Sequence, residues 1–358
     1  HNVLSVGERW IDVAKSRGGE RALKAYRDRF GDEWVQTRNT NGTLEARLRP
    51  LAEFRGLFEE PGRFLMIQSE ELTDRFEKKP IHVCATNIQE VIKPQGGTSV
   101  TDVIQRNVDA VLEQRKRTGQ PMFPHVNHPN FGWAITVEEL MAVQGERFFE
   151  VYNGHPAVYN EGSDVRPGTE RMWDIILTGH IAEGRPNLLY GVAVDDSHNY
   201  FREEPKMANP GRGWVMVRAA SLTPESLIDA MEAGNFYAST GVRLKEVKRD
   251  KDRLSLQIEP EKGVTYTTQF IGTRKGYDAR SEPVSTTDSD GKPVMVSRRY
   301  SKDVGQVLAE VKGTSASYRF RGDELYVRAK VTSSKRQVNG IREEDMESAW
   351  VQPVRPGR

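Results

Sequence analysis

Histidine and carboxylate side chains, the usual protein ligands of divalent transition metals, gather in five short stretches of the first two thirds of the chain. The stretches are His1-Asn2; Ser69-Glu70-Glu71 followed by His82; His125 to Pro129; Glu150 to His155; and Asp195 to His198. Each accompanies the end of a predicted strand. Because the carboxyl ends of strands in barrels and α/β sheets face one crevice, we expect these side chains to meet in one pocket. Such ligands suit Zn, Mn or Fe, and a carboxylate can bridge two neighbouring ions.

Other polar residues of these stretches are expected to support the ligands. Asp195 is predicted to orient an imidazole, and Glu70 is predicted to be solvated or to support Glu71. The remaining residues expected to line the pocket or to contact substrate are His125, Asn153 and His155.

A basic segment follows the last stretch. Arg202, Lys206 and Arg212 could hold a substrate anion, although a solvated loop is the plainer interpretation. His180 lies beside Gly179 near a predicted helix end, where it is expected to be a cap or a surface residue.

The first two thirds of the chain alternate predicted helices with short strands, which favours a parallel sheet or an α/β barrel. The clearest helix follows Ser99, which can cap it with Asp102 three residues on, and keeps a 3.6-residue apolar period to Leu112. Further helices are predicted over residues 6–16, 48–58, 137–143 and 170–177. Strands are predicted over residues 64–67, 121–126, 148–152 and 188–194.

The pattern changes near residue 240. A helix predicted from Thr223 ends at Gly234, and alternating apolar residues then indicate strands. Residues 273–300 are polar and rich in Gly, Pro and Ser, so we expect a long exposed loop there.

These patterns predict an α/β protein of two domains. Residues 1–240 are expected to form the metal-binding domain, and residues 241–358 a β-sandwich accessory domain without a histidine of its own.

Composition excludes several classes of protein. The 358 residues include 52 Lys and Arg against 51 Asp and Glu, a net charge of +1 that gives no general attraction to nucleic acid or anionic lipid. No apolar run approaches the about 20 residues of a membrane span. One cysteine, Cys84, excludes an intrachain disulfide and a multi-cysteine zinc site. Because the chain begins with His, we expect a processed or partial chain whose signal peptide, if any, lay upstream.

The ordered set of metal-type ligands resembles the PHP superfamily, the polymerase and histidinol phosphatase metallohydrolases. His1-Asn2 is similar to the end of an Asp-His-Asn motif, Ser69-Glu70-Glu71 to a Gly-x-Glu motif, and Asp196-Ser197-His198 to a closing Asp-x-His. His82 and His128 match the two intermediate histidines. Further motifs resemble a two-domain subgroup related to carbaryl (aryl carbamate) hydrolases: Trp173-Asp174, Gly191 to His198, Gly211 to Trp214, Gly234 to Gly241 and Ala349 to Pro353.

The resemblance implies a distorted (β/α)7-type barrel with one to three divalent ions. Glu71 would bridge ions, and the other implied ligands are His1, His82, His128, Asp196 and His198. The opening His-x-His of the family is absent from this chain. Glu71, His82 and His128 are therefore expected to form the complete site, whereas Asp196 and His198 contribute to partial ones.

The resemblance favours a phosphoesterase that acts through a metal-bound hydroxide, with Glu71 and Asp196 as catalytic residues and an anionic ester as substrate. A carbamate or other ester hydrolase of the same fold stays open. So does a non-catalytic protein that binds a ligand or carbohydrate on a degenerate PHP scaffold. The subgroup resemblance also implies an exported protein.

Overall fold

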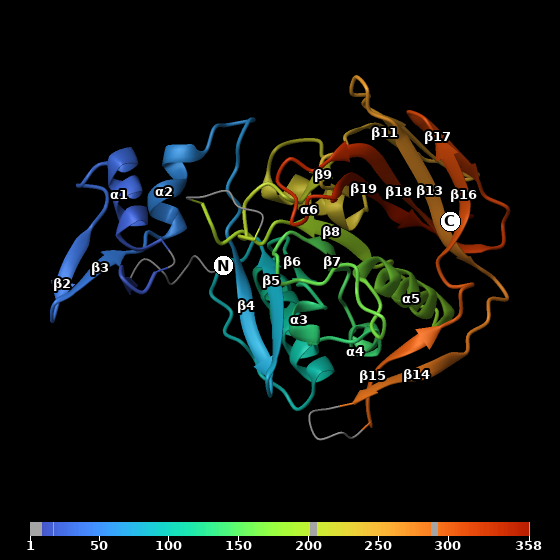
Figure 1. Cartoon of the computed structure of the whole chain (residues 1–358), viewed down its shortest axis with the longest axis horizontal. Coiled ribbons are helices and arrows are strands. Elements are labelled where there is room, and N and C mark those ends of the chain that lie inside the picture. The colour runs from blue at the N-terminus through green and yellow to red at the C-terminus, as the bar shows by residue number, and fades with distance from the viewer. Residues whose placement is uncertain (1–8, 17, 201–205, 288–292, 358) are drawn as a thin grey trace.

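The computed structural model describes residues 9–16, 18–200, 206–287 and 293–357. Figure 1 shows three parts along the longest axis: an N-terminal unit in blue, a central sheet with its helices, and orange and red strands towards the C-terminus. The mixed α/β class predicted from the sequence is confirmed, with strands predominating.

The N-terminal unit is a small sheet with two helices. It comprises β1 (Trp10–Asp12), α1 (Gly19–Phe30), β2 (Thr37–Thr40), β3 (Thr43–Arg47) and α2 (Leu51–Phe58). Val13, Leu23 and Val35 form its buried core. The helix predicted over residues 6–16 is wrong for the described part, because β1 pairs antiparallel with β3. Backbone pairing with a distant segment overrides a short local pattern.

The central sheet has the strand order β4-β5-β6-β7-β8. Its strands are β4 (Ser69–Phe76), β5 (Lys79–Thr86), β6 (Phe123–Val126), β7 (Phe148–Asn153) and β8 (Tyr190–Val194). The first three pair antiparallel and the last three parallel. Within the described residues this sheet is open, with β4 and β8 at its edges, so the predicted barrel is not confirmed. The strand predicted over residues 64–67 is also absent, since Phe64 makes only an isolated bridge with Glu60.

Helices cover one face of this sheet (Figure 1). They are α3 (Val100–Thr118), α4 (Val137–Ala142) and α5 (Thr169–Ala182), and a short 3-10 turn, η2 (Phe131–Trp133), follows β6. The predicted cap of α3 is confirmed, because the Ser99 side chain accepts a hydrogen bond from Asp102 N.

The two faces of the central sheet differ in polarity because side chains alternate along each strand. Leu72, Val83 and Val126 belong to the core shared with the helices. Their neighbours Glu71 and Cys84 therefore lie on the opposite face, and His125 of β6 is in the same cross-strand row. The other end of this second face is apolar and packs against α6 (Pro224–Glu232) and β10 (Phe236–Ser239).

The C-terminal part contains a six-stranded sheet and a three-stranded sheet. The order of the first is β16 (Gln306–Lys312), β13 (Tyr266–Arg274), β18 (Glu324–Arg336), β19 (Met346–Val354), β10 and β9 (Trp214–Val217). The second is β11 (Leu244–Arg249), β12 (Arg253–Ile258) and β17 (Ser315–Arg319). One apolar cluster joins side chains of both sheets, including Leu256 and Val331. Strands β9 and β10 precede residue 240, so sheet pairing crosses the predicted domain division, which itself stays a prediction.

The exposed loop predicted over residues 273–300 is wrong. Strand β13 continues to Arg274, and β14 (Ser281–Thr287) and β15 (Pro293–Tyr300) form an antiparallel pair. Tyr300 Oη donates to Glu138 Oε1 at 2.8 Å, so the polar hairpin is attached to the central unit. Among the helices of the described residues, none is long and apolar enough to cross a membrane.

Candidate metal centre

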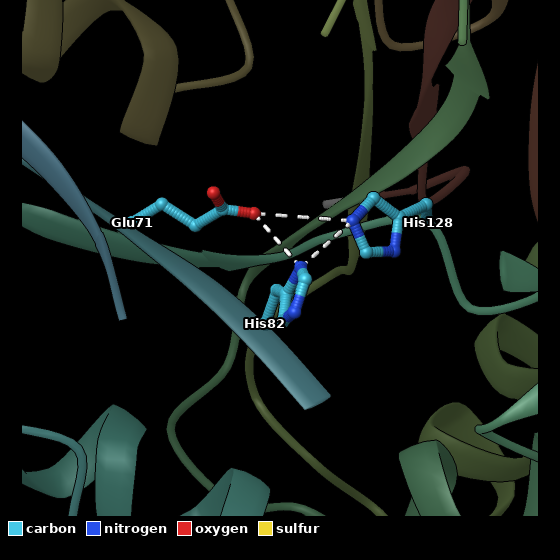
Figure 2. A group of neighbouring side chains, drawn as sticks. All are labelled: Glu71, His82 and His128. Carbon is cyan, nitrogen blue, oxygen red and sulfur yellow. Dashed lines mark hydrogen bonds and ion pairs between the residues drawn. The ribbon is translucent and has the colours of Figure 1, made fainter. Parts of the chain in front are cut away.

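Three predicted ligands converge on the polar side of the central sheet (Figure 2). Glu71 comes from β4, His82 from β5, and His128 from the segment directly after β6. Glu71 Oε1 lies 3.0 Å from His82 Nδ1 and 3.9 Å from His128 Nε2. The two ring nitrogens are 3.2 Å apart. One ligand atom of each residue thus lies within 4.8 Å of the other two, a spacing that a single ion with bonds of about 2 Å can bridge.

The strand pairing explains why these three residues meet. In the β4–β5 hairpin, Thr73 is opposite His82, which places Glu71 two residues away on the same face. Asn127 N donates to His82 O at 3.1 Å, and this bond brings the following His128 beside the hairpin. Glu71 and His82 therefore lie within antiparallel strands, and the expectation that they follow strand ends is wrong.

Asn127 connects Glu71 to the neighbouring strand. Its Nδ2 donates to Glu71 Oε1 at 3.2 Å and also lies 3.2 Å from Cys84 Sγ. Its Oδ1 accepts from Cys84 N at 2.9 Å. These contacts restrict the rotamer of a carboxylate that is only 7% exposed.

Glu150 of β7 supports His128 through the backbone. This carboxylate is 2% exposed, and its Oε2 accepts from His128 N at 2.7 Å and from Asn153 Nδ2 at 2.8 Å. Its Oε1 lies 3.4 Å from His125 Nε2. Burial alone would raise the pKa of Glu150, but the His125 interaction and the charge of the nearby imidazoles outweigh it and hold this pKa below its ordinary value.

Glu150 begins one of the five ligand-type stretches but was not predicted as a site residue. The available signal was a carboxylate inside an otherwise apolar strand, next in sheet order to the strand that carries His125. A buried carboxylate needs charged or hydrogen-bonding partners, so this position pointed to a polar cluster.

Asp196 lies at the same side of the sheet, just beyond β8. Asn153 Nδ2 is 3.2 Å from Asp196 Oδ2, which extends the chain of contacts from His128 through Glu150. Asp196 has a positive φ of 46°, a left-handed conformation uncommon for a residue other than glycine. Such backbone strain is found most often at functional sites.

His198 and His155 lie beside Asp196 but outside the three-ligand group. His198 Nδ1 is 2.7 Å from the Asp196 carbonyl oxygen and 3.6 Å from its Oδ1. The His155 ring packs edge-on against the His198 ring, with centroids 5.3 Å apart. Asp195, predicted to orient an imidazole, instead has an Oδ2 that accepts from Gly211 N at 2.6 Å.

The protonation state of His128 suits metal binding. Burial is the largest influence and lowers the pKa of His128 below its ordinary value, despite the opposing charge of Glu150 and other nearby carboxylates. The ring is therefore neutral at pH 7, the form in which imidazole binds metals.

Several predicted positions differ from the structure. Glu70 is not solvated: it is 4% exposed and accepts from Ile92 N at 2.6 Å. His180 is not a surface residue, because it is 6% exposed and its Nε2 is 3.0 Å from Met141 O.

Arg212 is not solvated, and the partners described for its guanidinium are backbone carbonyl oxygens, not an anion. It is 1% exposed and donates to Gly154 O at 2.8 Å and to Asn339 O at 2.7 Å. It therefore ties the segment before His155 to the loop between β18 and β19. His1 and Arg202 lie outside the described residues.

A cavity of about 530 Å³ opens beside the ligands. Glu71, His125 and Asp196 belong to its lining on the polar side, and side chains of α2 and of the segment before β4 line the other side. Its size is ordinary for a small-molecule site.

No protein-family model matches the chain, and no curated protein is similar to it. The chain is similar to one solved structure, a two-domain protein containing a predicted PHP-like metal-dependent phosphoesterase from Bacteroides vulgatus ATCC 8482. The two share 12% sequence identity over 84% of this chain and 77% of that chain, with a TM-score of 0.32. This likeness is too distant to assign a family or an activity.

Proposed function

We propose that this protein is a metal-dependent hydrolase that cleaves esters. The observation that carries the proposal is the convergence of Glu71, His82 and His128, of which Glu71 also lines a cavity of small-molecule size. One carboxylate and two imidazoles form a ligand set that suits Zn²⁺, Mn²⁺ or Fe²⁺ and leaves coordination positions open.

The donor set fits such an ion. Glu71 Oε1 faces both imidazoles, and the neutral state of His128 needs no proton to be displaced. A bound divalent ion would supply a water of lowered pKa and polarise the carbonyl or phosphoryl oxygen of the substrate. Asn127 and Glu150 would hold two of the ligands in place, and Asp196 would add a second carboxylate at the cavity wall.

The finer assignments also belong to this proposal. They are a PHP-type barrel, a β-sandwich over residues 241–358, further ions bound through Asp196 and His198, and export from the cell. A phosphoester or a carboxylic or carbamic ester would meet the same chemistry at this site.

The test is a comparison of Glu71→Gln with Glu70→Gln. Glutamine at position 71 keeps the shape but removes the charge that attracts a cation, so we expect loss of bound metal and at least a tenfold loss of hydrolysis. Glu70 also lines the cavity, but it is outside the three-ligand group and its Oε1 accepts from Ile92 N at 2.6 Å, so Glu70→Gln should retain both.

Metal content is measured by elemental analysis after dialysis, and hydrolysis with 4-nitrophenyl phosphate, bis(4-nitrophenyl) phosphate and 4-nitrophenyl butyrate. Unchanged metal and activity in Glu71→Gln would refute the proposal. Metal bound through Glu71 without hydrolysis of any ester would favour the non-catalytic alternative.

A further inference from the structure

The cavity beside the triad has two unlike walls. One wall is polar and carries Glu71 and Asp196. The rest of the lining includes six apolar residues of α2 and of the segment that leads into β4: Leu51, Phe54, Phe64, Leu65, Met66 and Ile67.

This apolar wall is held in place by hydrogen bonds. Arg55 Nη2 donates to Met66 O at 2.6 Å, and Met66 N donates to Glu59 Oε1 at 3.0 Å. Glu60 and Phe64 exchange two backbone hydrogen bonds of 3.0 and 2.9 Å. The aromatic surface is therefore fixed relative to α2 and is present before any ligand binds.

The charges of the lining oppose a second negative charge on the substrate. Among the described residues that line the cavity there is no Lys or Arg, whereas Glu70, Glu71, Glu150 and Asp196 are carboxylates. The one imidazole of the described lining, His125, is paired with Glu150 Oε1 at 3.4 Å. A doubly charged phosphate monoester would therefore meet more carboxylates than cationic groups among these residues, and its hydrophilic remainder would face Phe54 and Phe64.

We propose that the substrate is an ester with one apolar substituent, alkyl or aryl, and at most one negative charge, and that Phe54 and Phe64 determine this specificity. The inference rests on the proposed hydrolase function and adds the substrate class. The apolar substituent lies against the wall from the N-terminal unit while the ester group faces Glu71 and Asp196.

Two series of substrates test this inference. In each series the acyl or alkyl chain of the ester lengthens by two methylenes per step. The first is 4-nitrophenyl acetate, butyrate and hexanoate; the second is methyl, propyl and pentyl 4-nitrophenyl phosphate. Burial of each methylene is worth about fourfold, so kcat/KM should rise by about fifteenfold per step in the series that is cleaved.

Phe64→Ser and Phe54→Ser should flatten this rise through a higher KM with little change in kcat, as expected for the loss of binding alone. Leu57→Ser is the matched control, because Leu57 is on the same helix, is 56% exposed and is outside the cavity lining. It should keep the full rise.

A binding measurement separates this inference from the hydrolase proposal. The neutral fluorescent probe N-phenyl-1-naphthylamine should bind the metal-free protein with one-to-one stoichiometry, at least fivefold more weakly in Phe64→Ser, and unchanged in Leu57→Ser. If no ester is cleaved, the hydrolase proposal fails, and this binding pattern alone then shows whether Phe54 and Phe64 form an apolar binding site. A flat chain-length series with metal-dependent cleavage, or probe binding insensitive to Phe64 and Phe54, would overturn the inference and leave the hydrolase proposal intact.

Discussion

Glu150 supports the candidate centre without belonging to the three-ligand group. Its carboxylate holds the backbone of His128 and the side chain of Asn153, so the position of one ligand depends on a residue 22 positions away in the chain. Partners that orient metal ligands commonly change metal affinity by 10- to 100-fold when they are altered.

Glu150→Gln should therefore weaken metal binding about 10- to 100-fold while leaving the fold intact. The amide oxygen can accept only part of the hydrogen bonding of the carboxylate, and the negative charge beside His128 is lost. Metal titration against a chelator of known affinity measures the change.

Glu146→Gln provides the control for Glu150→Gln. Burial raises the pKa of Glu146 to about 8, so this carboxyl is mostly protonated at pH 7 and resembles a glutamine in charge and shape. Metal affinity should be unchanged. Equal metal affinity in both variants would contradict a supporting role for Glu150.

At the scale of elements, local periodicity correctly predicts a helix or strand when the packing of the segment favours the same structure as its own sequence pattern. Helix α3 has a polar cap and a long apolar stripe, and it forms as predicted. Strand β1 is three residues long and is determined by its pairing with β3, which no local pattern contains. In the β14–β15 hairpin Val294, Met295 and Val296 are consecutive and the other residues are mostly polar, so no two-residue alternation marks it.

The candidate site shows the same division. Motif order brings His128 and Asp196 to one pocket because both follow parallel strands. The positions of Glu71 and His82 depend on the register of the β4–β5 hairpin, and the position of Glu150 depends on the pairing of β7. None of these three positions could be predicted without knowledge of the sheet.

The end of helix α5 makes stability sensitive to acid. Burial, followed by the Arg185 guanidinium 3.0 Å away, lowers the pKa of His180 to about 4 from 6.5. The unfolded chain therefore binds more protons between pH 6.5 and 4, and stability that is complete above pH 6.5 is lost as the pH falls through this window. His180 should account for about 2 kcal/mol of the loss between pH 7 and pH 5.

His180→Gln removes this titration. Chemical unfolding at pH 7 and pH 5 should show a smaller loss of stability in the variant, by about 2 kcal/mol. An identical loss in the wild type and in His180→Gln would contradict the assignment of this pH dependence to His180.

At the scale of the whole molecule, a buried ion pair joins the central unit to the six-stranded sheet. Asp174 of α5 accepts from Arg328 Nε and Nη2 of β18, each at 2.8 Å, and from Tyr326 Oη at 2.8 Å. Arg328 is 1% exposed, and its guanidinium lies 4.9 Å from the centre of the Trp173 ring. Each charge depends on the other, because water cannot replace either partner.

Asp174→Ala should therefore lower the free energy of unfolding by about 3–5 kcal/mol, because it leaves the Arg328 charge buried without its hydrogen-bonded partner and with only Glu170 Oε2 nearby, at 3.8 Å. The double variant Asp174→Leu/Arg328→Met should recover most of this loss, since two apolar side chains need no compensating charge. The exposed pair Glu90–Arg117, whose side chains are 60% and 59% exposed, is the control, and Glu90→Ala should cost less than about 1 kcal/mol. Denaturant unfolding followed by tryptophan fluorescence measures all three variants. If Asp174→Ala cost no more than Glu90→Ala, the ion pair would not contribute to the coupling of the two units.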